Sequence, residues 1–192
     1  YSNNTWIQIG YDSDGEAVDE RLGRSLSLNA FGDRIVIGAR KNDGTGTDAG
    51  HARVFEYTNN AWSQMGPDID GEAAGDNSGY SISINAEGDR VAIGAPSNNG
   101  TGSGAGHVRV YEYISAASSW SLLGSDIDGE AAGDDSGYSV YLNAVGDRVA
   151  VGAPFNSGSG SFAGHTRVYE YVDNSWSQLQ NDMDGEAAGD NF

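Results

Sequence analysis

Apolar and polar residues alternate over several short stretches of this chain, as they do in strands that bury one face. In the first part of the sequence this pattern covers residues 25–29 (SLSLN) and 51–57 (HARVFEY). Residues 34–39 (RIVIGA) are more continuously apolar, which is typical of a strand buried on both faces, and residues 62–65 add a fourth short stretch. Turn residues separate the four stretches, and helical periodicity is absent. The pattern predicts four short antiparallel strands.

The same group of strands is predicted again further along the chain. Four tryptophans, Trp6, Trp62, Trp120 and Trp176, stand at intervals of 56, 58 and 56 residues. One aspartate and one histidine per repeat keep this step, at Asp33, Asp89 and Asp147 and at His51, His107 and His165. A fixed period of this kind indicates a repeat architecture. Four strands in about 57 residues are typical of a propeller blade, so we predict an all-β, β-propeller-type array of about 3.4 repeats.

The predicted repeats cover residues 1–57, 58–113, 114–171 and, as a partial fourth copy, 172–192. The first copy diverges in its acidic loop, residues 19–24, and it carries Arg40 where the later copies have proline. Terminal repeats are often atypical because one face lacks a neighbour, although ordinary drift would look the same. The chain starts without methionine and stops within a repeat, so we expect a mature segment, or a piece that further chain or a partner subunit completes.

The second strand of each repeat predicts close stacking of the blades. In residues 91–95 (VAIGA) and 149–153 (VAVGA), one face carries branched apolar side chains and the other face only alanine or glycine. A strand of this kind is buried on both sides and lets a neighbouring sheet approach its small face closely.

Two short motifs connect the repeats to a known family. Residues 79–81 (GYS) precede 91–96 (VAIGAP), and residues 137–140 (GYSV) precede 149–154 (VAVGAP). This pattern resembles the FG-GAP repeats of integrin alpha-chain propellers and their bacterial and algal relatives, and the resemblance covers essentially the whole chain. It implies a propeller fold. The family often has a calcium loop, Asp-x-Asp-x-Asp-Gly, between the first two strands of a blade, but residues 85–89 (NAEGD) are too short for that site.

Composition excludes several classes of function. Ten basic and 28 acidic residues give a net charge of −18, which repels nucleic acid and anionic membranes and favours cations. There is no cysteine, so disulfides and thiolate metal sites are excluded. No apolar run is long enough for a transmembrane helix, and we expect no membrane insertion.

The clearest candidate chemistry is an acidic loop, Asp-x-Asp-Gly-Glu, that recurs once per repeat. Calcium prefers carboxylate and carbonyl oxygens, and glycine permits the sharp turn of such loops. The alternative is an inter-blade loop whose carboxylates accept backbone N–H groups in Asx-type turns. The candidate calcium ligands are Asp12, Asp14, Glu16, Asp68, Asp70, Glu72, Asp76, Asp126, Asp128, Glu130, Asp134, Asp182, Asp184, Glu186 and Asp190, with Glu20 as a further acid of the first copy.

Other repeated side chains have two interpretations each. The three histidines could form a metal ring near a propeller axis, or they could be satisfied structural residues. The four tryptophans could be sugar-stacking platforms, but at a fixed blade position core packing is favoured. The Asp-Arg pairs that begin the second strands are expected to tie the strand entrance to an adjacent loop. Asn3 and Asn99 fit the Asn-x-Ser/Thr acceptor pattern for glycosylation.

These patterns favour a non-enzymatic, extracellular or cell-surface module. No nucleophile, base and orienting group stand out, and every polar candidate occurs in several equivalent copies. We therefore predict a structural or adhesion protein that acts by multivalent contacts, with the rest of a longer chain or other copies of itself as partners. The blades would close a larger ring or stack into a filament. The alternative is a calcium-dependent or carbohydrate-binding recognition propeller with glycan partners.

Overall fold

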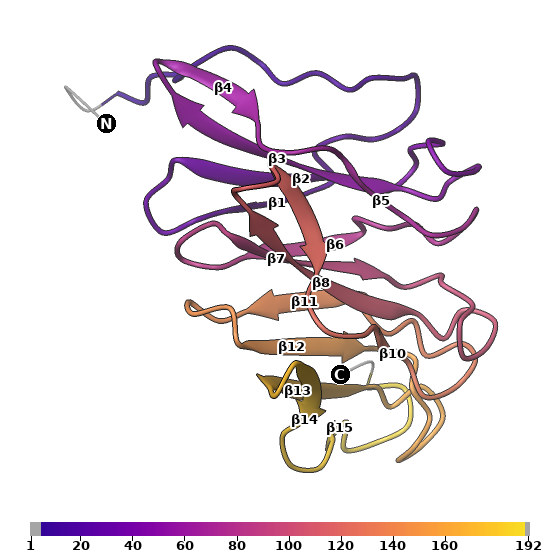
Figure 1. Cartoon of the computed structure of the whole chain (residues 1–192). Coiled ribbons are helices and arrows are strands. Elements are labelled where there is room, and N and C mark those ends of the chain that lie inside the picture. Colours follow the sequence, from indigo (N-terminus) through magenta and orange to yellow (C-terminus); the bar gives the residue numbers. More distant parts are fainter. Residues whose placement is uncertain (1–4, 191–192) are drawn as a thin grey trace.

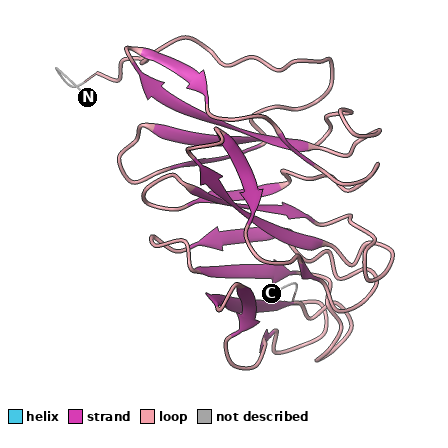
Figure 2. Ribbon diagram, in the orientation of Figure 1, coloured by secondary structure: helices cyan, strands magenta, loops and turns pink. Residues whose placement is uncertain are grey.

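The computed structural model describes residues 5–190, and this part of the chain consists of strands and loops without helices (Figure 2). Fifteen strands of this described part form three sheets, which confirms the all-β prediction. The first sheet contains β1 (Ser25–Leu28), β2 (Arg34–Ala39), β3 (His51–Thr58), β4 (Ala61–Gln64) and β5 (Ile69–Asp70). The second contains β6 (Ser81–Ile84), β7 (Arg90–Ala95), β8 (His107–Ile114), β9 (Ser119–Leu122) and β10 (Ile127–Asp128). The third contains β11 (Ser139–Leu142), β12 (Arg148–Ala153), β13 (His165–Val172), β14 (Ser175–Gln178) and β15 (Met183–Asp184).

Each sheet is a four-stranded antiparallel meander with a short extra strand. In the first sheet β1, β2, β3 and β4 pair in chain order, and β5 pairs with the start of β3. The other two sheets repeat this arrangement, so each sheet corresponds to one blade. The predicted fourth strand at residues 62–65 is β4, and the two-residue strand was not predicted.

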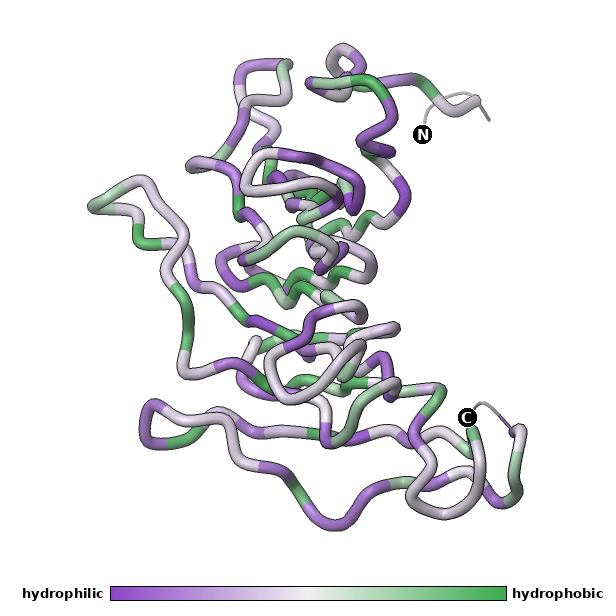
Figure 3. Tube along the Cα trace, turned by 90° about the vertical axis from the view of Figure 1, so that its right-hand side faces the viewer, coloured by the Kyte–Doolittle hydropathy of each residue, from purple (hydrophilic) through white to green (hydrophobic). Residues whose placement is uncertain are grey.

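The three blades are stacked in chain order, from the purple to magenta first blade to the yellow C-terminal region (Figure 1). The first strands β1, β6 and β11 contact one another in series, which places them nearest the common axis. Two apolar cores lie between the blades, and Figure 3 shows green segments along the stacked strands. The core between the first and second blades includes Val36, Val54, Met65, Ile69, Ile82, Ile84, Val91 and Ile93.

Two details of the blade stacking were predicted from sequence. A Cβ atom on Gly94 would collide with the carbonyl oxygen of Gly137 in the next blade, so the small face of this strand does admit a close neighbour. The Arg90 side chain donates to the carbonyl of Gly146 over 3.2 Å, so the Asp-Arg pair reaches the turn of the adjacent blade.

Tryptophan connects each blade to the segment before it. The indole N–H of Trp120 donates to the carbonyl oxygen of Met65 over 2.8 Å, and that of Trp176 donates to Leu123 over 2.7 Å. Trp120 and Trp176 pack, partly buried, against the two apolar cores, which confirms their packing role. Trp62 donates in the same way to the Ile9 carbonyl and packs against Tyr57, but it belongs to neither core. The prediction is wrong for Trp6, which is 88% exposed because it lies in the segment before the first sheet.

The outer face of the first blade carries apolar residues that are exposed. Ile82 and Ile84 of β6 are buried against the first blade, with 8% and 6% exposure. The equivalent residues of β1, Leu26 and Leu28, are 63% and 52% exposed. Leu26 and Leu28 are therefore apolar like the residues buried between two blades, but no described blade covers them. Within residues 5–190, no helix is long and apolar enough to cross a membrane.

Candidate metal centres between the blades

Each of the three histidines lies at the first position of the third strand in its blade. His51, His107 and His165 begin β3, β8 and β13, and their side chains are almost completely buried. In the sequence an Ala-Gly pair precedes each histidine, and Gly50 and Gly106 have a left-handed backbone that turns the chain into the strand. The fold therefore fixes three imidazoles at equivalent places.

The short extra strand brings an aspartate to each histidine. In the first blade β5 pairs with β3 so that Asp70 lies opposite His51. This pairing holds the preceding turn, and with it Asp68, over the imidazole. The distance from the histidine Nδ1 atom to the nearer oxygen of this aspartate is 3.6 Å for Asp68, and 3.8 Å and 3.5 Å for Asp126 and Asp182 in the later blades.

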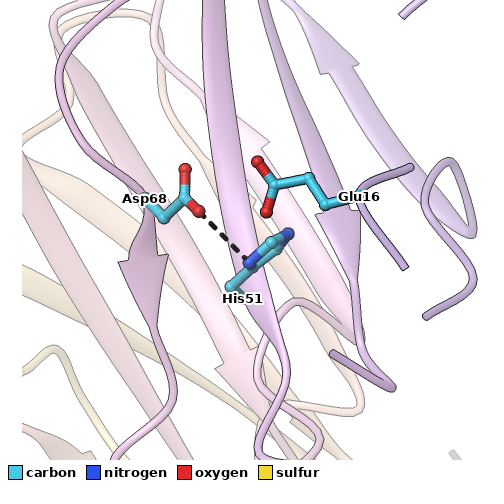
Figure 4. Close-up of side chains that lie close together, drawn as sticks. All are labelled: Glu16, His51 and Asp68. Carbon is cyan, nitrogen blue, oxygen red and sulfur yellow. Dashed lines mark ion pairs between the residues drawn. The ribbon is translucent and has the colours of Figure 1, made fainter. Parts of the chain in front are cut away.

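A glutamate completes each cluster, and it comes from the acidic loop that enters the blade. The clusters are Glu16–His51–Asp68, Glu72–His107–Asp126 and Glu130–His165–Asp182. In each, one potential ligand atom per residue lies within 4.8 Å of the other two. Figure 4 shows Glu16 and Asp68 on two sides of the His51 ring. In the second and third clusters the glutamate therefore comes from the loop after the preceding blade. In the first cluster it comes from the N-terminal segment.

An arginine two residues after the histidine orients the carboxylates. In the second cluster the Arg109 side chain bonds to Oδ1 of Asp126 over 2.9 Å and forms an ion pair with Oε1 of Glu72. The other carboxylate oxygens face His107 Nδ1, at 3.8 Å for Asp126 and 3.9 Å for Glu72. In this cluster arginine binds one oxygen of each carboxylate, and the other oxygen is directed at the imidazole. In the third cluster Arg167 also donates over 3.3 Å to Oδ2 of Asp182, the oxygen that faces His165.

The imidazole nitrogens are close to these oxygens but not hydrogen-bonded to them. Nδ1 of His165 is buried and has no hydrogen-bond partner, although it lies 3.5 Å from Asp182 and 4.0 Å from Glu130. Hydrogen bonds of this type are shorter, at about 2.7–3.2 Å. Two ligands bound tetrahedrally to one zinc ion at about 2.0–2.2 Å lie roughly 3.3–3.6 Å apart. The 3.5 Å between His165 Nδ1 and the Asp182 oxygen is therefore close to the separation of two ligands around one ion.

Burial also favours the coordinating form of the imidazole. Desolvation lowers the pKa of His107, against the opposing effect of the nearby Asp126 carboxylate. A lower pKa keeps the imidazole neutral near neutral pH, and the neutral ring is the form that binds metals.

The remaining acids of the predicted calcium loops do not gather around the same points. Asp76 and Asp134 are buried inside the loop, where Asp76 accepts hydrogen bonds from the Ala73 amide and the Asn98 side chain. Glu20 takes this place in the first blade. The others are exposed: Asp12, Asp14, Asp70, Asp128, Asp184, Glu186 and Asp190. The structure thus distributes each loop's carboxylates among separate surroundings, and calcium binding stays a prediction.

Sequence reasoning treated the histidines and the acidic loops as separate features. It missed the clusters because the histidine and the aspartate of a cluster are 17 or 19 residues apart, and the glutamate lies 35 residues before the histidine. The sequence does contain a sign of the clusters, because the histidines and the acidic loops recur with the same period. Of the two glycosylation candidates, Asn3 lies outside the described residues, and Asn99 is exposed in the loop after β7.

Comparison with known proteins supports the fold. No family model matches the chain, and no curated protein sequence matches it. Among solved structures, a candidate 6-phosphogluconolactonase from Bacteroides uniformis superposes with a TM-score of 0.65 at 10% identity, over 96% of this chain and 46% of that protein. A candidate 6-phosphogluconolactonase from Bacteroides fragilis gives 0.55 at 11% identity, over 83% of this chain and 38% of that one. Sqt1 from Saccharomyces cerevisiae gives 0.53 at 14% identity, over 85% and 36%.

These similarities correct the predicted function. Two of the proteins that share the fold are named for an enzymatic activity, so the exclusion of enzymes and the resulting adhesion hypothesis are wrong as drawn. The error was to take repetition of polar groups as evidence against catalysis, since one fold carries many functions. At 10% and 11% identity the likeness shows a propeller-type fold alone, and this chain spans less than half of either protein.

Proposed function

We propose that this chain is a propeller segment that binds divalent transition-metal ions between its blades, one ion at each Glu–His–Asp cluster. One observation carries the proposal: Nδ1 of His165 is buried without a hydrogen-bond partner and faces two carboxylate oxygens at 3.5 and 4.0 Å. A buried polar atom without a partner destabilises a fold by about 1–3 kcal/mol, and an ion bound beside His165 would supply the missing partner.

The ligand set indicates the class of metal. One imidazole nitrogen and two carboxylate oxygens suit zinc and its neighbours in the first transition row, whereas calcium and magnesium prefer oxygen alone. With a neutral imidazole, two carboxylates and one arginine, each cluster has a net negative charge that a divalent cation reverses. The net charge of −18 adds a general attraction for cations.

Each ion would join two consecutive parts of the chain. In the second cluster Glu72 comes from the loop that leaves the first blade, whereas His107 and Asp126 belong to the second. An ion that binds the folded state alone stabilises it by mass action. Metal binding would therefore strengthen the contact between neighbouring blades.

We further propose that the repeats are of the FG-GAP type. The support is the position of the two motifs, with Gly79 and Gly137 at the entrance of a first strand and the following VAIGAP and VAVGAP stretches in the buried second strands. The exposed leucines of β1 support further blades, from a longer chain or another copy, as partners. A location outside the cell remains our hypothesis, and secretion of the tagged full-length chain is its direct measurement.

The metal proposal is tested by titrating chelator-treated protein with zinc chloride in a calorimeter. Three equivalents of zinc are expected, with a higher melting temperature in zinc than in EDTA. His165→Ala should reduce the stoichiometry to two. Glu170→Gln is the matched control, because it removes a carboxylate from the same strand that pairs with Arg148 away from the cluster. Undiminished stoichiometry in His165→Ala, or no binding by the parent protein, would refute the proposal.

A further inference from the structure

The three repeats differ in character at two facing positions of the loop between the second and third strands. The first blade has an ion pair there, between Lys41 and Asp48. The second has Ser97 and Gly104, and the third has Phe155 and Phe162. The sequence around these positions is nearly the same in each copy. In repeat proteins such variable loop positions often form the binding face, so the aromatic pair is a candidate recognition element.

Phe162 is in an unfavourable place for a phenylalanine. Its backbone is left-handed, with φ of 53°, and its side chain is 54% exposed. The equivalent residues, Asp48 and Gly104, have φ of 56° and 63° and belong to types that tolerate this region better. The aromatic neighbour of the Phe162 ring is Phe155, so the chain keeps a large apolar pair at an exposed place where the backbone favours other residue types. Strain of this kind is often retained at binding sites.

The two phenylalanines line a cavity of about 420 Å³. Their rings are perpendicular, with centroids 6.1 Å apart, and the Tyr138 ring lies 6.2 Å from Phe155, also nearly perpendicular. Glu130 and Asp134 of the acidic loop also line the cavity, and the buried Asp134 carboxylate accepts hydrogen bonds from the Ala131 amide and the Asn156 side chain. The cavity therefore combines aromatic ring surfaces with carboxylates, at a size suited to a small organic molecule.

We infer that this cavity binds a small organic ammonium ion, such as a quaternary or primary amine. Aromatic faces attract ammonium groups through the ring quadrupole, and pairs or cages of aromatic rings recognise quaternary ammonium in this way. The net charge of −18 adds electrostatic attraction, whereas the Glu130 carboxylate at this cavity is already paired with Arg167. The same charges disfavour anionic ligands. The second blade lacks the aromatic walls, and the first has the Lys41 ammonium in their place, so one site per chain is expected.

The test is a calorimetric or NMR titration of the full chain with choline, in chelator-treated buffer so that the result is independent of metal binding. The comparison ligand is 3,3-dimethyl-1-butanol, which has the shape of choline without its charge. Choline should bind at one equivalent and at least tenfold more tightly than the alcohol. Equal affinity for the two ligands would show a merely apolar pocket and overturn the inference, as would absence of choline binding.

The variants exchange the third-blade residues for those of the second blade. Phe162→Gly and Phe155→Ser should each weaken choline binding at least tenfold. The glycine variant relieves the left-handed backbone, so its melting temperature should be unchanged or higher, which separates lost binding from lost folding. Phe31→Ala, at a phenylalanine 68% exposed in the first blade, is the control and should bind choline normally. Normal binding by both third-blade variants would assign choline to another place and refute the site.

Discussion

Asp76 and Glu72 lie four residues apart in one acidic loop, yet their surroundings are opposite. The Asp76 side chain is 1% exposed and accepts hydrogen bonds from the Ala73 amide and the Asn98 side chain. Glu72 is 42% exposed at its side chain and faces His107 and Arg109 of the next blade. Both carboxylates recur in the other repeats, so recurrence alone does not distinguish them.

The difference shows how a structural carboxylate can be told from a candidate ligand. Asp76 has its nearby donors supplied by the protein, which is what a buried charge requires. Glu72 has one oxygen bound by arginine and the other directed at an imidazole nitrogen 3.9 Å away, a distance too long for a hydrogen bond. The saturated carboxylate holds the loop, and the incompletely satisfied one is available to an ion.

The largest effect is expected from Asp76→Ala. The change leaves the Asn98 side chain and the Ala73 amide without their acceptor in a buried place, and it opens a small cavity. The free energy of unfolding should fall by about 3 kcal/mol, measured by urea denaturation. Zinc stoichiometry should remain three in the folded fraction. A loss below about 0.5 kcal/mol, the range of ordinary surface changes, would mean that Asp76 has no structural role.

Asn98→Ala approaches the same network from its other partner. Asn98 also accepts from the Gly100 amide over 2.8 Å, so two hydrogen bonds are lost, and stability should fall by about 2 kcal/mol. The double variant with Asp76→Ala should lose less than the sum of the single losses, because both remove one shared bond. Strict additivity in the denaturation curves would contradict a direct coupling between these side chains.

The fold was predictable because local and repeated signals agree. The alternating stretches at residues 25–29 and 51–57 gave strands that the structure contains, and the small residues around Gly94 gave the close stacking. The clusters were not predictable by the same reasoning, because Glu72 and His107 are brought together only when one blade stacks on the next. The short strand β5, which sets His51 opposite Asp70, is too brief to have a pattern of its own.

Glu72→Gln should show the reverse of the Asp76 result. An exposed glutamine replaces a half-exposed carboxylate, so the free energy of unfolding without metal should change by less than about 1 kcal/mol. Zinc stoichiometry should fall from three to two, because glutamine removes a charged ligand from the second cluster. Calorimetry on chelator-treated protein measures the second quantity, and urea denaturation in EDTA the first. A full set of zinc sites in this variant would remove Glu72 from the ligand set.

The smallest effect is expected from Glu170→Gln on the third blade. Glu170 pairs with Arg148 over 2.7 Å, but the arginine side chain is 55% exposed, in contrast to the buried surroundings of Asp76. Exposed ion pairs contribute about 0–1 kcal/mol to stability, because solvent and salt screen them. At low ionic strength the variant should therefore lose no more than about 0.5 kcal/mol of unfolding free energy. In about 0.5 M salt, where screening is strong, the loss should be smaller. Zinc binding should be unchanged. Urea denaturation at low and at high salt measures this difference. A loss comparable to that of Asp76→Ala would show that charge pairing, and not burial with saturated hydrogen bonds, determines how much these carboxylates stabilise the fold.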